Sequence, residues 1–352
     1  MIYFDVTKTG AAGHRSGLMR VSTRLRDGLG AAATEVVWAD GTLKRASSPA
    51  QPLALRADDW VFTSELFSEE ERPGFTAFLA ARPCRFAAVF HDAIPLKYPH
   101  ITWPKSVARH PAYMKLLSRF DRVWAVSQAS REELLGFWQW QGAENLPPVD
   151  VLALGADFDH QPPATKATGL AARSTRPSLL CIGIVEPRKN QSFLLDVCDA
   201  LWRGGLDFEL HLVGRVNPHF GAPIVANIKS LRRVHGARLQ FHEAASDALV
   251  SQLYSNARAS AFPTIAEGCG LPLLESLRLG VPCVHSDLPV LRENAAGGGC
   301  LAAALNDPAA WQSALRAILT DDALHARLAA EARARVLPTW ADAAKQLIAV
   351  LR

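Results

Sequence analysis

The sequence contains no long apolar run. No hydrophobic stretch approaches the roughly 18 to 20 residues that a membrane-spanning helix needs. The opening stretch, MIYFDVTKTG, also lacks the charged start and the long apolar middle of a secretion signal. These absences predict a protein of the cytoplasm that does not span a membrane.

Paired cysteines are missing as well. The six cysteines are scattered, with no CxxC pair and no Cys/His set at zinc spacing: Cys84, Cys181, Cys198, Cys269, Cys283 and Cys300. We therefore expect reduced thiols, no disulfide and no structural metal. The sequence also has no internal repeat, no low-complexity segment and no GxGxxG dinucleotide fingerprint.

Charge is modest, at +4, and no nucleic-acid motif accompanies it, so nucleic acid is not expected as a partner. The basic residues are nevertheless unevenly placed. Five lie between Lys8 and Arg26 with no acid. Six lie between Lys97 and Arg122 with one acid, and Tyr98, Trp103 and Tyr113 are interleaved with them. Such surfaces suit anionic lipid headgroups or phosphate-bearing ligands, and a merely solvated face is the alternative. We expect peripheral contact with the inner face of the cytoplasmic membrane.

The length of 352 residues exceeds the size at which one core usually keeps growing, so two domains are expected. Residues 161–177 are rich in Pro, Ala, Thr and charge, without an apolar period, and read as a linker. The predicted domains are therefore 1–160 and 178–335. Residues 336–352 are predicted to form a helix on the surface that can cross back to the first domain.

Short β-rich runs alternate with helical patterns throughout, which predicts an α/β fold with two parallel sheets covered by helices and facing across a cleft. The predicted strands are 1–7, 34–40, 60–66, 85–92, 121–127 and 149–155, then 178–185, 208–214, 238–242, 259–263, 282–286 and 299–305. The predicted helices are 16–30, 106–120 and 130–138, four that begin near residues 190, 246, 272 and 289, and C-terminal ones at 307–320, 321–336 and from 341.

The stretch FPTIAEGCGLPLLESLRLGVPC, residues 262–283, is the first candidate site. Ligands of open α/β sheets bind beyond the carboxyl ends of the strands, and here a strand leads into a glycine loop and then a helix, with Pro272 suited to its first turn. The helix start can bind an anion such as a diphosphate. Glu275, one turn into the helix, can accept from a ribose diol, and Glu267 can grip a sugar hydroxyl. The alternative is that Glu275 complements the helix dipole and Glu267 is solvated.

A second candidate follows the strand at 178–185, where the stretch EPRKN places Arg188 and Lys189 at the entry to a helix. Two adjacent cations at the end of a strand are not readily explained by packing, so we expect them to bind phosphate. The alternative is that they are ordinary solvated surface charges.

The first half offers weaker signals. Gly10, Gly13 and Gly17 follow the first strand and permit close approach of the backbone to a ligand. His91 and Asp92 follow the strand at 85–92, where a histidine can handle a proton near an acceptor hydroxyl. A satisfied structural histidine is the alternative.

These motifs resemble those of family 4 retaining glycosyltransferases with the GT-B fold. FPTIAEGCGLPLLESLRLGVPCVHSDLPVLRE resembles the family's signature of two glutamates separated by seven residues, and GIVEPRKN resembles its phosphate-binding segment. Two further stretches occur in the same order along the chain as in the family, DRVWAVSQASREEL and HLVG. The N-terminal half resembles the family only loosely. FHDAIPLKYP and SGLMRV are most similar to mannosyltransferases of bacterial surface-polysaccharide assembly.

The resemblance implies roles for individual residues. Glu267 would contact the donor sugar and Glu275 the nucleotide ribose, and the glycine loop between them would lie beside sugar and phosphate. Arg188 and Lys189 would hold the diphosphate. The remaining implied residues are Gly268, Cys269, Gly270 and Leu271 in the loop, Gly17 closing over the phosphate, and His91 with Asp92 beside the acceptor. Cys269 departs from the family, where phenylalanine is usual, and alters the sugar pocket.

The implied reaction is transfer of a hexose, mannose from GDP-mannose, to a lipid-linked or polysaccharide acceptor with retention of anomeric configuration. Catalysis is expected from Glu267, His91, Arg188 and Lys189, with no metal or other cofactor, since the cations and the helix start supply positive charge. The alternatives are transfer from a UDP-sugar (glucose, GlcNAc or galactose), a nucleotide-sugar epimerase on the same fold, and a non-catalytic nucleotide-sugar-binding protein.

Overall fold

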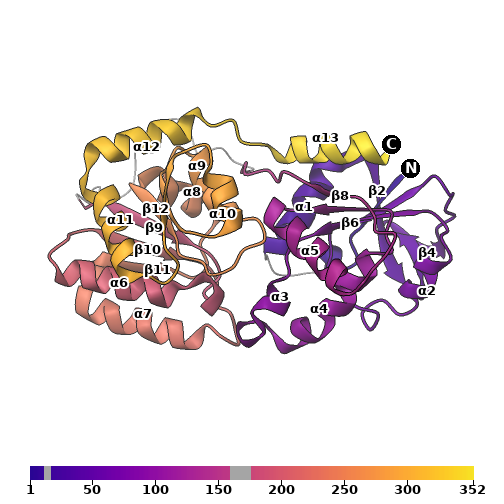
Figure 1. Cartoon of the computed structure of the whole chain (residues 1–352), viewed down its shortest axis with the longest axis horizontal. Coiled ribbons are helices and arrows are strands. Elements are labelled where there is room, and N and C mark those ends of the chain that lie inside the picture. The colour runs from indigo at the N-terminus through magenta and orange to yellow at the C-terminus, as the bar shows by residue number, and fades with distance from the viewer. Residues whose placement is uncertain (12–16, 159–175) are drawn as a thin grey trace. The chain divides into compact units, whose positions relative to one another are not determined.

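A computed structural model of the chain describes residues 1–11, 17–158 and 176–352 (Figure 1). The chain divides into two compact units: Met1–Gly155 together with Pro338–Arg352, and Ala156–Leu337. The division at Gly155 precedes the boundary predicted at residue 160, and nearly all of the predicted linker, 161–177, lies outside the described residues. A cleft between the two sheets stays a prediction.

Within the described residues of the first unit, eight strands form one sheet in the order β4-β3-β2-β1-β5-β6-β7-β8. From β2 to β8 the neighbours pair in parallel, as predicted. The strands are β1 (Ile2–Asp5), β2 (Ala33–Ala39), β3 (Thr42–Arg45), β4 (Ser48–Pro52), β5 (Trp60–Thr63), β6 (Arg85–Phe90), β7 (Arg122–Ala125) and β8 (Val149–Val151).

At one edge this sheet carries two antiparallel strands that were not predicted, β3 and β4. The turn between β2 and β3 consists of Asp40 and Gly41, with φ of 52° and 74°. Two residues with positive φ form the turn whose twist suits a hairpin, and Asp-Gly is a preferred sequence for it. This dipeptide was therefore a readable signal for the missed hairpin.

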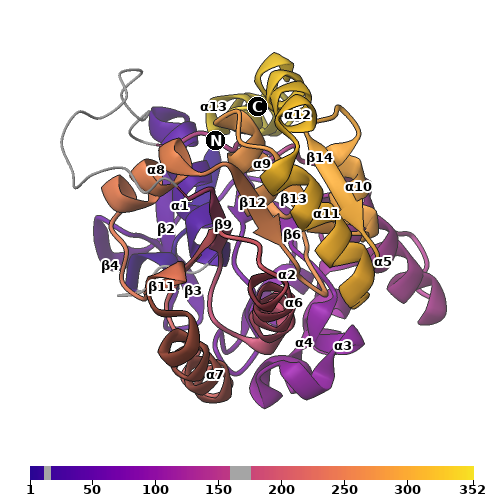
Figure 2. The ribbon, with the colours of Figure 1, turned by 90° about the vertical axis from the view of Figure 1, so that its left-hand side faces the viewer.

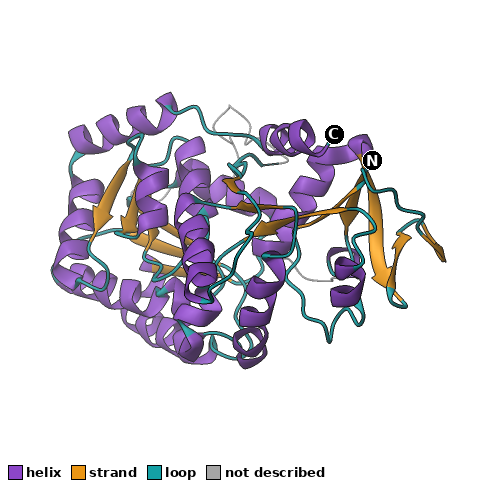
Figure 3. Cartoon of the chain, turned by 45° about the vertical axis from the view of Figure 1, so that its right-hand side comes forward, coloured by secondary structure: helices purple, strands orange, loops and turns teal. Residues whose placement is uncertain are grey.

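Helices cover both faces of this sheet (Figure 3). One core cluster joins strand residues such as Val61 and Phe86 to α2, α4 and α5. Elsewhere α13 packs against α1, where a Cβ added to Gly28 would lie 2.9 Å from the Cβ of Ala344. The C-terminal helix thus belongs to the first unit. The helices are α1 (Gly17–Leu29), α2 (Phe75–Ala80), α3 (Ile94–Lys97), α4 (Pro104–Leu117), α5 (Gln128–Trp140) and α13 (Trp340–Leu351).

In the second unit, the described residues form a six-stranded sheet in which all neighbours are parallel, in the order β11-β10-β9-β12-β13-β14 (Figure 2). The predicted strands are all present. They are β9 (Ser178–Ile182), β10 (Glu209–Val213), β11 (Leu239–His242), β12 (Ala259–Phe262), β13 (Cys283–Ser286) and β14 (Cys300–Ala303).

The helices of this unit cover the sheet on two sides. A core cluster buries residues of α6, α7 and α11 on one face, and a second cluster contains Leu253 and Tyr254 of α8. Among them, α7 was not predicted. The helices are α6 (Gln191–Arg203), α7 (Ala222–His235), α8 (Asp247–Asn256), α9 (Leu271–Arg278), α10 (Pro289–Ala295), α11 (Pro308–Thr320) and α12 (Asp322–Ala334).

The strand order of the second unit has a reversal point. From β9 the chain adds β10 and β11 on one side, then returns to add β12, β13 and β14 on the other. The loops after β9 and β12 therefore leave the same sheet edge side by side and lead to helices on opposite faces. Such a reversal is where open α/β sheets bind ligands.

Candidate active site

The two predicted motifs meet at this reversal point. After β9, a 3-10 helix at Pro187–Lys189 presents Arg188 and Lys189, and Asn190, with φ of 58°, turns the chain into α6. The ammonium group of Lys189 forms an ion pair with Oε1 of Glu267. Arg188 Nη1 lies 3.2 Å from the same oxygen. The structure thus brings together residues that are almost eighty positions apart in the chain.

Backbone contacts fix the two loops to each other. The amide of Ile265 donates to the carbonyl oxygen of Arg188 at 2.9 Å, and Arg188 Nη1 donates to the carbonyl oxygen of Ala266 at 3.1 Å. The hydroxyl of Thr264 donates to Glu267 Oε1 at 2.9 Å. The Glu267 carboxylate is therefore held by a hydroxyl and two cations at once.

Electrostatics keep Glu267 ionised. Burial alone would raise its pKa, but Lys189 and Arg188 together hold the pKa of this carboxyl below its usual range. Arg188 also pairs with Glu186, whose Oε1 lies 2.8 Å from Nη2. Two cations thus face two carboxylates, and these four side chains carry no net charge.

The glycine loop leads into α9 as predicted. Gly270 adopts φ of 80°, and a Cβ there would lie 2.6 Å from Leu291 Cδ2, so glycine is needed for both reasons. No side chain caps this helix start. Glu275 lies one turn into α9 and is only 2% exposed. Glu267, which the alternative interpretation takes as solvated, has a side chain that is only 9% exposed.

Cys269, next to Gly268 in this loop, is half-buried, and its carbonyl oxygen accepts from Asn294 Nδ2 at 2.5 Å. Burial raises the pKa of the Cys269 thiol to about 12. The thiol is therefore protonated near neutral pH and is a poor nucleophile. Its effect on a ligand would be steric.

The remaining predicted residues belong to the first unit. His91 is buried, and its Nε2 lies 2.8 Å from the carbonyl oxygen of Ser64. Burial lowers the pKa of His91, so the ring is neutral near pH 7. Asp92 Oδ1 accepts from the amide of Ile94 at 3.0 Å. Gly17 is the first residue of α1, and a Cβ there would meet no atom within 4 Å.

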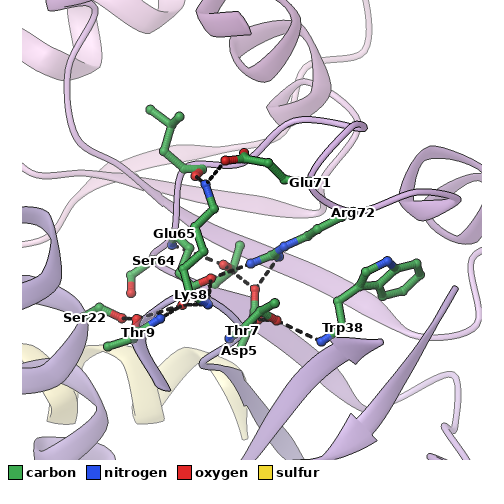
Figure 4. Close-up of polar contacts among 12 residues, drawn as sticks. Asp5, Thr7, Lys8, Thr9, Ser22, Trp38, Ser64, Glu65, Glu71 and Arg72 are labelled. Carbon is green, nitrogen blue, oxygen red and sulfur yellow. Dashed lines mark hydrogen bonds and ion pairs between the residues drawn. The ribbon is translucent and has the colours of Figure 1, made fainter. Parts of the chain in front are cut away.

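Sequence reasoning missed a buried ionic cluster at the ends of β1 and β5 (Figure 4). Arg72 is 1% exposed and lies between Asp5 and Glu65, with N–O distances of 2.5 Å to each. Glu65 in turn accepts from the amides of Lys8 and Thr9. In the sequence Arg72 directly follows three glutamates, a pattern that is typical of an exposed, charged surface segment.

The basic stretches are partly neutralised by acids from elsewhere. Lys8 and Arg109 both pair with Glu71, and Lys97 pairs with Glu133. Counting charge along the chain could not reveal these partners. Membrane contact therefore stays a prediction. None of the helices in the described ranges is long and apolar enough to cross a bilayer.

Metal ligands do not gather in the parts of the chain that the structure describes: no three His, Cys, Asp or Glu side chains lie where they could hold an ion. Whether the reaction needs a metal is a separate question, and metal independence stays a prediction.

Comparison with known proteins finds a family match within the second unit. Residues 176–321 match the family of glycosyl transferases group 1. Over 257 residues, 69% of the chain, the sequence is 28% identical to the serotype-specific mannosyltransferase WbdA of Escherichia coli. Over 246 residues, 68% of the chain, it is 28% identical to a GDP-mannose-dependent alpha-(1-6)-phosphatidylinositol dimannoside mannosyltransferase of Mycobacterium tuberculosis. These matches span 31% and 60% of the two relatives' own lengths.

Solved structures show the same fold. Sucrose-phosphate synthase of Thermosynechococcus elongatus superposes with a TM-score of 0.73 at 18% identity, covering 98% of this chain and 96% of that one. Anabaena HepE, solved in complex with UDP and glucose, superposes with a TM-score of 0.70 at 15% identity, covering 99% and 98%. Both are GT-B proteins, so the predicted α/β fold class is confirmed. The chain therefore has the GT-B fold, and its residues 176–321 match the family of glycosyl transferases group 1.

Proposed function

We propose that the chain is a retaining glycosyltransferase that moves mannose from GDP-mannose to a lipid-linked or polysaccharide acceptor in surface-glycan assembly. The observation that carries this proposal is the contact of Arg188 and Lys189 with Glu267 at the strand reversal of the second unit. Two cations for a diphosphate and one carboxylate for a sugar hydroxyl are the groups that a sugar donor requires.

The choice of donor rests on the relatives. Both sequence relatives described above are mannosyltransferases by name, and one is named as GDP-mannose-dependent. HepE, in contrast, was solved with UDP, at an identity that supports only the fold. GDP-mannose is therefore the first donor to test, and UDP-glucose, UDP-GlcNAc and UDP-galactose are the alternatives.

In the proposed donor complex, the diphosphate takes the place between the cations and the start of α9. Arg188 offers a planar fork of donors and Lys189 a compact charge. The uncapped start of α9 adds backbone N–H groups and the positive end of its dipole. Glu275 accepts from the ribose diol, and Glu267 from a sugar hydroxyl.

The proposed chemistry is a front-face displacement. The bond between the sugar's anomeric carbon and the phosphate oxygen breaks while the acceptor oxygen bonds to the same carbon on the same face. The acceptor's proton passes to the leaving phosphate oxygen. Negative charge develops on the diphosphate, where Arg188 and Lys189 stabilise it without needing a metal. The configuration is retained because both oxygens occupy one face.

On the acceptor side, we assign His91 and Asp92. If His91 keeps its proton on Nε2, facing the Ser64 carbonyl oxygen, Nδ1 is the nitrogen left to accept from an acceptor hydroxyl. Peripheral membrane contact would involve α4, whose Lys105 and Lys115 are exposed. Reversing both charges should then abolish cosedimentation with anionic vesicles, and unchanged binding would exclude α4 as the contact.

The test is incubation of the purified chain with each of the four donors, with and without a mannose-terminated lipid or oligosaccharide acceptor. We expect nucleoside diphosphate release and a lengthened acceptor only with GDP-mannose, and loss of both in Glu267→Ala. Donor isomerised without acceptor would instead establish an epimerase. Donor binding without turnover would establish a binding protein, and full activity in Glu267→Ala would exclude the proposed site.

A further inference from the structure

Glu186 is an acidic side chain directly before the 3-10 helix that presents Arg188 and Lys189. Its side chain is 14% exposed. Oε1 accepts from Arg188 Nε at 3.1 Å and lies 2.8 Å from Nη2, so one carboxylate oxygen holds one edge of the guanidinium group. The other end, Nη1, faces Ala266 and Glu267.

Glu186 is itself anchored by a second loop. Its Oε2 accepts from Asn217 Nδ2 at 2.9 Å. Asn217 lies between β10 and α7, and its position is fixed through its own amide, which donates to the carbonyl oxygen of Val185 at 3.0 Å. Its Oδ1 also accepts from the amides of His219 and Phe220. The carboxylate thus links Arg188 to a loop that is rigid for independent reasons.

The backbone beneath Glu186 is held as firmly. Gln191 is 2% exposed, and its Nε2 donates to the carbonyl oxygen of Ile184 at 2.8 Å. Its Oε1 accepts from the amide of Glu186 at 3.4 Å. Contacts within the protein therefore constrain both the backbone and the carboxylate of Glu186.

We propose that Glu186, anchored by Asn217, is a positioning residue that fixes the guanidinium plane of Arg188 toward the donor diphosphate. A long arginine side chain loses rotamer freedom when it binds, and a guanidinium oriented in advance loses less. A carboxylate beside a phosphate site weakens phosphate binding by charge repulsion. We infer that orientation of the Arg188 guanidinium by Glu186 offsets this repulsion. This inference rests on the proposed function of Arg188.

The test compares Glu186→Ala, Glu186→Gln and Asn217→Ala, each with and without Arg188→Ala, in transfer assays with GDP-mannose. Glu186→Gln and Glu186→Ala remove the same charge, but glutamine keeps an oxygen for Arg188. We expect kcat to fall about tenfold in Glu186→Ala and severalfold in Asn217→Ala, and to stay within about threefold in Glu186→Gln. On the Arg188→Ala background, Glu186→Ala should cause no further loss. The control is Asp322→Asn, which breaks the exposed Arg258–Asp322 pair in the same unit.

The outcomes separate this inference from the function on which it rests. If Arg188→Ala lowers transfer but Glu186→Ala does not, or if the Glu186→Ala loss persists without Arg188, Glu186 does not position Arg188. Equal effects of alanine and glutamine would make Glu186 a counter-charge only. If wild-type protein releases no GDP, or Arg188→Ala leaves transfer unchanged, the proposed site itself is wrong whatever Glu186 does.

Discussion

Replacing Glu267 by glutamine should have opposite effects on two measurable properties of the site. In the structure the Glu267 carboxylate contacts both Arg188 and Lys189. The four side chains Arg188, Lys189, Glu186 and Glu267 sum to zero charge, and Glu267→Gln raises that sum to +1. An anion should bind the variant more tightly, although the proposed contact between carboxylate and donor sugar is lost.

The size of the binding effect follows from Coulomb's law. A phosphate that contacts the Lys189 ammonium from the open side would lie about 8 Å from the carboxylate on its other side, given ionic hydrogen bonds of about 2.8 Å. At an effective dielectric constant of about 20, two unit charges at about 8 Å repel by about 2 kcal/mol. Removing this repulsion corresponds to about 30-fold tighter binding of GDP or pyrophosphate. Transfer should fall about 10²- to 10³-fold.

Calorimetry with pyrophosphate and with GDP measures the first effect at low ionic strength, and release of GDP from GDP-mannose in the presence of acceptor measures the second. Asp322→Asn also removes one negative charge from the second unit, but at a position outside the proposed site. It controls for the effect of net charge alone on anion binding. Weaker or unchanged pyrophosphate binding in Glu267→Gln would refute the idea that Glu267 competes with phosphate for the cations. Undiminished transfer would refute its role toward the sugar.

Three further predictions concern stability. Arg72→Met leaves Asp5 and Glu65 as buried, unpaired acids, so urea denaturation should show a loss of about 3 to 5 kcal/mol; a loss below about 1 kcal/mol would contradict this. Gly28→Ala places a Cβ 2.9 Å from the Cβ of Ala344 and should lower the free energy of unfolding. The matched change Gly136→Ala, in α5, meets no atom within 4 Å and should raise it by up to about 1 kcal/mol. A gain in stability from both changes would show that α13 can move away from α1 without destabilising the protein. Burial lowers the pKa of six histidines below 6.5 in the folded protein, so the unfolded chain binds more protons at these residues. The melting temperature should therefore fall as the pH drops below about 6.5. A melting temperature that stays constant or rises when the pH is lowered from about 7.5 to about 5.5 would refute this. The six are His91, His110, His211, His242, His285 and His325.

The sequence predicted those elements whose apolar pattern decides their structure. The strands of both parallel sheets are short runs buried on both faces, such as Ile2–Asp5 and Ala259–Phe262, and such runs are recognisable by composition. Two of the missed elements, β4 and α7, lack that pattern. All residues of Ser48–Pro52 are exposed, and Ala222–His235 buries only Ile224 and Ile228.

In the candidate site, too, some residues could be predicted from local sequence and others could not. That Arg188, Lys189 and Glu267 meet could be predicted because each lies in the loop after a strand, and the strand order then brings these loops to one edge. Glu186 lies in the same motif as Arg188 and Lys189, but the role proposed for it depends on Asn217, thirty-one positions away. Arg72 depends on Asp5, sixty-seven positions away. Partners at such separations follow from tertiary structure, which local sequence pattern does not encode.

The return of the C-terminal helix to the first unit has a consequence for biosynthesis. The second unit is one continuous stretch of chain, whereas the first is interrupted by it and is completed by α13. A ribosome therefore synthesises all of the second unit before it makes the helix that packs on α1. Until then the apolar side of α1 that α13 covers is exposed to solvent and to chaperones, so nascent chains stalled before residue 338 should bind a holdase that the full-length chain does not.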